Sequence, residues 1–96
     1  MAQAWKRLEK VTATQLGGVR QKRGADFSQS APDVLHERFA VECKYRKNLP
    51  KLLTDGLAQA AHYAPDKIPL LVVKERYQRG ALVVLRLSDF QEVLKL

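Results

Sequence analysis

The chain has 96 residues, enough for one compact domain (1–96) with a single hydrophobic core and too few for a second recognition module. Its formal net charge of +7 suits a polyanionic partner, either nucleic acid or an acidic membrane surface. The single cysteine excludes an intrachain disulfide and a cysteine-built zinc site, and we find neither a signal peptide nor a membrane-spanning apolar run. These features predict a cytoplasmic protein without a membrane partner.

Residues 2–16 are predicted to form a helix that Gly17 ends in a left-handed conformation. The apolar stripe on one helix face comprises Trp5, Leu8, Thr12 and Leu16. Glu9 lies beside this stripe. It is either a surface acid close to two lysines or an acid that reaches a functional site.

A short strand is expected to begin at Val19, followed by a surface loop over residues 21–30. Basic residues outnumber the single acid Glu9 in this part of the chain: Lys6, Arg7, Lys10, Arg20, Lys22 and Arg23. A charged run of this kind is either a solvated face or a phosphate-binding surface. We favour phosphate contacts for Arg20, Lys22 and Arg23, because the run directly precedes a proposed metal-binding hairpin at residues 31–46. Asp26 is either a turn residue or a further acid of the site.

Residues 31–46 are predicted to form a β-hairpin, because apolar and polar residues alternate along its second half. One face of that strand would carry the side chains of Phe39, Val41, Cys43 and Tyr45. Glu42 and Lys44 would share the other face. Cys43, on the apolar face, is expected to be a buried structural thiol rather than a nucleophile.

The register of this hairpin decides which charged residues meet. A reversal at Glu37-Arg38 places Val34 opposite Val41 and Asp33 opposite Glu42, whereas an odd-length loop or a bulge would shift the pairing. Directly opposed carboxylates lie roughly 5 Å apart and repel each other. A divalent cation removes that conflict, because Mg²⁺ prefers carboxylate and phosphate oxygens. With a lysine nearby to orient a water, such a group is suited to phosphodiester cleavage.

A second helix is predicted to open at Asn48-Leu49-Pro50 and to end before Pro65. Gln59 and Tyr63 lie one turn apart on the same side of this helix. In one interpretation, Tyr63 packs at the edge of the core and Gln59 is solvated. In the other, Gln59 hydrogen-bonds Lys44 or a metal-bound water, and Tyr63 touches nucleic acid.

Two further strands, at residues 69–74 and 81–87, are predicted around a turn, the first of them an interior strand. Ser88 and Gln91 form a capping-box pattern that would open a final helix through Leu96. The order helix, three strands, helix, two strands, helix predicts an α/β fold (α+β with a mixed sheet). Apolar residues of the final helix would cover a sheet edge or meet a second subunit.

Further basic residues flank these elements. Arg46 and Lys47 continue the basic face directly after the hairpin. Lys74 and Arg76, at the exit of a strand, either extend a phosphate-binding surface or keep the strand end soluble. We favour nucleic-acid contacts for both pairs.

The spacing of Pro32-Asp33 and Glu42-Cys43-Lys44 resembles the PD-(D/E)XK nuclease superfamily. The resemblance extends to the helix that carries Glu9. It also includes Gln59 to Tyr63, which is similar to the Gln-x-x-x-Tyr signature of recombination-type exonucleases. The short chain and its N-terminal helix look most like archaeal Holliday-junction resolvases and their small phage relatives.

This resemblance implies a restriction-endonuclease-like core and a Mg²⁺-dependent DNA endonuclease, with Mn²⁺ able to substitute. It implies that the metal ligands are Asp33, Glu42, the backbone carbonyl of Cys43, and Glu9. Lys44 and Gln59 would complete the catalytic group. The implied location is the cytoplasm of a prokaryotic cell or a virus-infected host cell.

The sequence also supports expectations about the substrate and the assembly of the protein. No sequence-reading module such as a helix-turn-helix is present, so we expect the protein to recognise branched DNA or a Holliday junction by its structure. Junction resolution in recombination requires two coordinated cuts, which favours a homodimer. The alternatives are an end-processing exonuclease of the same superfamily and a non-catalytic DNA-binding accessory subunit. An unknown accessory protein could deliver the DNA.

Overall fold

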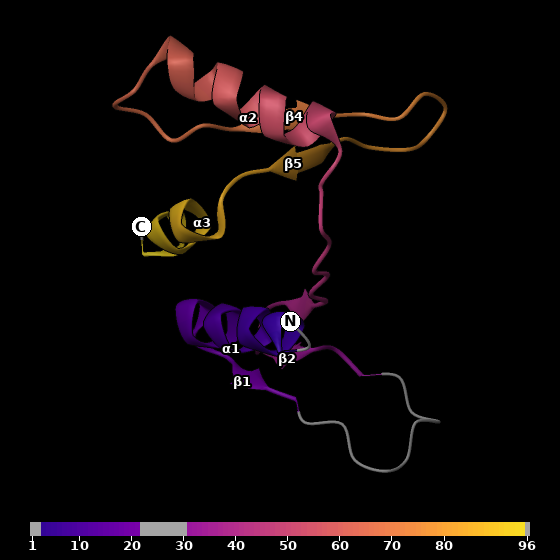
Figure 1. Ribbon diagram of the computed structural model, residues 1–96, viewed down its shortest axis with the longest axis vertical. Coiled ribbons are helices and arrows are strands. Elements are labelled where there is room, and N and C mark those ends of the chain that lie inside the picture. The colour runs from indigo at the N-terminus through magenta and orange to yellow at the C-terminus, as the bar shows by residue number, and fades with distance from the viewer. Residues whose placement is uncertain (1–2, 22–30, 96) are drawn as a thin grey trace. The chain divides into compact units, whose positions relative to one another are not determined.

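The computed structural model describes residues 3–21 and 31–95 (Figure 1). The protein is a mixed α/β structure with the element order α1 β1 β2 β3 α2 β4 β5 α3, which confirms the predicted order. The chain divides into two compact units, Met1–Arg46 and Lys47–Leu96. Across the described ranges, every helix is too short or too polar to cross a bilayer. The single domain over residues 1–96 stays a prediction.

Helix α1 (Ala4–Leu16) ends where the glycine predicts. Gly17 adopts φ 73°, a left-handed conformation that glycine takes without steric cost, and its N–H donates to the carbonyl of Ala13. The buried face is rotated from the predicted stripe: Glu9, Thr12 and Ala13 are buried, whereas Trp5 is 47% exposed. Of the predicted stripe, Thr12 is buried and Trp5 is not. The interpretation of Glu9 as a surface acid is wrong, because its side chain is buried.

Three short strands form an antiparallel sheet in the order β1-β2-β3, with β1 at Val19–Arg20, β2 at Val34–Leu35 and β3 at Ala40–Val41. Val34 pairs with Arg20 on one side and with Val41 on the other. The Val34–Val41 pair confirms the predicted hairpin register. Helix α1 packs against β1 and β2, and the side chain of Val34 is completely buried.

Gly18 allows the end of α1 to approach β2 closely. A Cβ atom added there would lie 2.6 Å from the carbonyl oxygen of Leu35 and 2.8 Å from Cγ1 of Val34. His36, in the turn after β2, has its Nε2 atom 2.9 Å from the carbonyl oxygen of Leu16, the last residue of α1. The helix and the hairpin are thus joined at this end by close packing and by a hydrogen bond.

The hairpin ladder is shorter and less regular than predicted. Strand β3 ends at Val41, whereas the alternation predicted a strand over residues 39–45. The N–H of Asp33 donates to Val41 at 2.7 Å, and its carbonyl accepts from the N–H of Gln21 at 2.9 Å. In a regular antiparallel pair both groups of a residue bond to the same neighbour. The backbone partner of Asp33 on the β3 side is therefore Val41, a shift of the kind that a bulge produces, and not Glu42.

In the second unit, helix α2 (Lys51–Tyr63) follows Pro50 and ends at Ala64. It packs against β4 (Leu71–Val73) through Gly56, where an added Cβ would lie 2.7 Å from a terminal methyl group of Leu71. Strand β4 pairs in antiparallel orientation with β5 (Leu82–Val84). The described strands thus form two antiparallel sheets, where the sequence predicted one mixed sheet with residues 69–74 in its interior.

Helix α3 spans Leu87–Leu94 and begins two residues earlier than a capping box at Ser88 predicts. Arg86 occupies the N-cap position without a side-chain capping bond, so the predicted capping box at Ser88 is wrong. Asp89 lies in the first turn, where a negative charge interacts favourably with the helix dipole.

Candidate functional site

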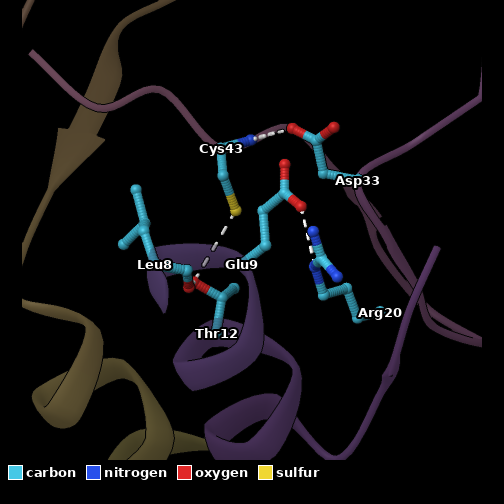
Figure 2. Close-up of polar contacts among 6 residues, drawn as sticks. All are labelled: Leu8, Glu9, Thr12, Arg20, Asp33 and Cys43. Carbon is cyan, nitrogen blue, oxygen red and sulfur yellow. Dashed lines mark hydrogen bonds and ion pairs between the residues drawn. The ribbon is translucent and has the colours of Figure 1, made fainter. Parts of the chain in front are cut away.

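The buried polar residues of the described chain are Glu9, Thr12 and Asp33, of which Glu9 is 7% and Asp33 is 4% exposed. Figure 2 shows them around Cys43, with Glu9 and Thr12 reaching from α1 toward the segment that carries Asp33 and Cys43. Burying a carboxylate costs free energy unless hydrogen bonds or opposite charges replace water. Each of the two carboxylates has such a partner.

Asp33 is held by the backbone of the hairpin. Its Oδ2 atom accepts a hydrogen bond of 2.6 Å from the N–H of Cys43 (Figure 2). Because the same residue also bonds to Val41 through its own N–H, both its main chain and its side chain are anchored. The irregular backbone at Asp33 thus leaves its carboxylate fixed beside the main chain of Cys43.

Glu9 is paired with Arg20. The Nε atom of Arg20 lies 2.9 Å from Oε1 of Glu9, and their side chains are 20% and 10% exposed. This contact joins α1 to β1 across the edge of the site (Figure 2). We predicted a phosphate contact for Arg20 and did not foresee this pair, because the two residues belong to different elements.

Thr12 is a part of the site that our sequence reasoning missed. Its hydroxyl donates to the carbonyl of Leu8 at 2.7 Å, and the thiol of Cys43 lies 3.6 Å from the same oxygen. The sequence does hold a signal, because Thr12 follows Glu9 by one helical turn and is a polar residue on a face that packs inward. Thr12 fixes the side chain of Cys43, while Asp33 fixes its backbone.

Cys43 lies in the field of three carboxylates. Burial raises the pKa of its thiol, and the negative charges of Asp33, Glu9 and Glu42 raise it further, against an opposing effect of the Thr12 hydroxyl. The thiol therefore keeps its proton, as a structural cysteine would.

Glu42 and Lys44 lie on the outer side of the hairpin. Their charged atoms are 3.1 Å apart, and the side chains are 52% and 64% exposed. This pair confirms that the two residues share a face of the chain. Over residues 3–21 and 31–95, no three His, Cys, Asp or Glu side chains are grouped so that they could hold a metal ion. The carboxylates of this region and the backbone carbonyl of Cys43 are nevertheless oxygen donors, which a hard divalent cation prefers.

The other predicted site residues have contacts of their own. In α2, the amide of Gln59 donates to the hydroxyl of Tyr63 at 2.8 Å, which confirms that they share a helix face. In the second unit, Lys74 donates to the carbonyl of Gln78, and Arg76 stacks on the ring of Tyr77. Their predicted roles in catalysis and DNA binding stay predictions.

Arg46 and Lys47 are exposed, at the end of the first unit and the start of the second. Lys22, Arg23 and Asp26 lie outside the described residues. Comparisons of the chain with models of protein families, with curated proteins and with solved structures found no match. The resemblance to PD-(D/E)XK nucleases therefore rests on the sequence pattern alone.

Proposed function

We propose that the protein is a Mg²⁺-dependent DNA endonuclease of the PD-(D/E)XK type, built on a restriction-endonuclease-like core. One observation supports this proposal above the others. Glu9 and Asp33, which come from distant positions in the sequence, are the buried carboxylates of the described chain, and both belong to the group of residues around Cys43 in Figure 2. Because buried carboxylates are rarely a net gain in stability, their convergence favours a chemical role.

The proposed metal ligands are Asp33, Glu42, the backbone carbonyl of Cys43, and Glu9. These are oxygen donors, which suit Mg²⁺ and allow Mn²⁺ to substitute. When bound, the ion supplies charge stabilisation at the scissile phosphate and favours ionisation of a water molecule. Glu42, now paired with Lys44 at the surface, is the ligand whose side chain would have to turn to join the set.

Other residues of the chain would position the ligands and orient the attacking water. Asp33 is kept in place by the N–H of Cys43, and Thr12 keeps the Cys43 side chain from rotating. Lys44 would orient the attacking water and offset charge on the phosphate, for which an exposed, flexible ammonium is suited. The resemblance also implies a catalytic role for Gln59, which we keep as part of the proposal.

DNA is the proposed substrate, and its branched or junction structure is the feature that we propose to be recognised. The residues proposed to contact DNA are Arg46, Lys47, Tyr63, Lys74 and Arg76, with Lys22 and Arg23. The cations among them would bind phosphates. Two coordinated cuts require two active sites, so we propose a homodimer. Exposed apolar side chains of the second unit, including Val72 and Val83 on one face of the β4–β5 pair, are available for such an interface.

The test is a cleavage assay with a four-way junction, a linear duplex and single strands, in Mg²⁺, Mn²⁺ or chelator. Asp33→Asn keeps an oxygen that can accept the N–H of Cys43, and Lys44→Met keeps the side-chain length. We expect each to reduce the cleavage rate by about a hundredfold or more with DNA binding largely retained. Asp55→Asn is the matched control, because Asp55 is an exposed acid of α2.

Symmetric nicks at the crossover support a resolvase, and progressive shortening from the ends supports the exonuclease alternative. Salt-sensitive DNA binding without cleavage in either metal would instead identify a non-catalytic accessory subunit. Full activity in Asp33→Asn or in Lys44→Met would contradict the assignment of the site.

A further inference from the structure

A permanent positive charge lies inside the cluster of acids. The side chain of Arg20 is 20% exposed, and its guanidinium makes an ion pair with Glu9 through Nε (Figure 2). Arginine stays protonated at every pH at which a protein is folded. The site therefore contains a built-in cation as well as its carboxylates.

The fold holds Arg20 beside both buried acids. Arg20 pairs with Val34 in the ladder between β1 and β2, and the next residue, Gln21, donates its N–H to the carbonyl of Asp33. The main chain at Arg20 thus runs alongside Asp33, while its side chain reaches Glu9 on α1. A buried carboxylate that loses a paired counter-charge is strongly destabilised, so this contact is expected to persist until another cation replaces it.

We propose that Arg20 is the internal counter-ion of the acidic cluster and competes with a divalent cation for Glu9. The inference rests on the proposed function, because it assigns Glu9 to the same metal site. A guanidinium and a metal ion at one carboxylate repel each other at short range. Occupation of the site therefore requires Arg20 to release Glu9, and the freed guanidinium can then bind a phosphate oxygen of DNA.

This arrangement makes Arg20 a positioning residue that sets the affinity for metal. In the metal-free protein it keeps Glu9 turned inward, and in the loaded protein it becomes a phosphate ligand. The dual role accounts for its position in a basic segment and for its pairing with a buried acid. Removing Arg20 should lower the stability of the metal-free protein and should tighten the binding of the metal.

Isothermal titration calorimetry with Mn²⁺ and no DNA measures this competition directly. We expect Arg20→Gln to bind Mn²⁺ about threefold to tenfold more tightly than the unmodified protein, which is the size expected for a partly buried ion pair. Arg7→Gln is the control, because it removes the same charge from an exposed position of α1. Its affinity should stay within about twofold. Mn²⁺ should also raise the melting temperature of Arg20→Gln by more than it raises that of the unmodified protein.

A second measurement needs no folded variant. In the unmodified protein, the hydrogen-bonded Nε–H of Arg20 should give a protected NMR signal that Mg²⁺ shifts or removes. Equal or weaker Mn²⁺ binding by folded Arg20→Gln would overturn the inference, as would a Mg²⁺-saturated protein with an unchanged Nε–H signal. Absence of metal binding to the unmodified protein would overturn the proposed function together with the inference.

Discussion

The two compact units hold their polar side chains in different ways. In the first, hydrogen bonds and ion pairs connect residues that are distant in sequence: Arg20 with Glu9, Cys43 with Asp33 and Thr12, and His36 with Leu16. In the second, the side-chain bonds between Gln59 and Tyr63 and between Lys74 and Gln78 each lie within one element or one turn.

This difference indicates where the chemistry is organised. A bond between neighbours on a helix forms wherever the helix forms, and therefore defines no three-dimensional site. A bond between α1 and the hairpin forms only in the correct tertiary structure, and it fixes a carboxylate or a backbone group relative to others. The first unit thus has the character of a preorganised site.

The largest expected difference in stability is between alanine substitutions of two glycines, one in each unit. In Gly18→Ala the new methyl group would meet the carbonyl oxygen of Leu35, which the sheet holds in place. We expect a loss of about 2–3 kcal/mol in the free energy of unfolding, measured with urea. In Gly56→Ala the methyl group meets the flexible end of Leu71, and alanine favours helix formation. We expect a change within about 1 kcal/mol, and an equal loss in both variants would contradict the contrast.

His36 is expected to show the next largest effect. Its Nδ1 atom accepts the N–H of Arg38, so the proton is on Nε2, which donates to the carbonyl of Leu16. His36→Ala removes both bonds and should cost about 1–2 kcal/mol in the free energy of unfolding. Tyr63→Phe removes one exposed bond of α2 and should change that free energy by less than about 0.5 kcal/mol. Equal losses in the two variants would show that long-range and local bonds contribute alike.

Substitution of Glu42 should affect the activity of the first unit without affecting its stability. Its ion pair with Lys44 is exposed, so Glu42→Gln should change the free energy of unfolding by less than about 0.5 kcal/mol. Because Glu42 is a proposed metal ligand, the same substitution should remove DNA cleavage. Urea unfolding and the junction assay, performed on the same preparation, check both expectations. Cleavage at the normal rate would exclude Glu42 from the metal site.

The smallest expected effect concerns the pH dependence of Cys43. Burial and the nearby carboxylates raise its pKa, so alkylation by iodoacetamide should have its midpoint at a higher pH than in the unfolded chain. Because the folded state retains the thiol proton more tightly, this contribution to stability is complete below the ordinary thiol pKa and disappears as the pH rises through the raised value.

Thr12 provides the matched test of this shift, since its hydroxyl lowers the pKa of the thiol. Thr12→Val should therefore move the alkylation midpoint to still higher pH. Mass spectrometry at a series of pH values measures both midpoints. A folded protein that reacts as fast as the unfolded chain would show that Cys43 is not shielded.

Sequence periodicity predicted the local structure well. The order of all eight elements follows from alternation, helical spacing and turn residues, and Gly17 marks the end of α1. The Val34–Val41 register followed from the position of the hairpin turn. These features depend on neighbours in the chain, which a sequence displays directly.

The tertiary structure alone decided which partners these residues have. Packing of α1 on β1 and β2 turned Glu9, rather than Trp5, inward and brought it to Arg20. The irregular backbone at Asp33 placed its carboxylate on the N–H of Cys43 instead of opposite Glu42. A periodic pattern specifies the face on which a side chain lies. The partner that the side chain meets depends on the rotation and spacing of whole helices and strands. Packing between residues that are distant in sequence sets both.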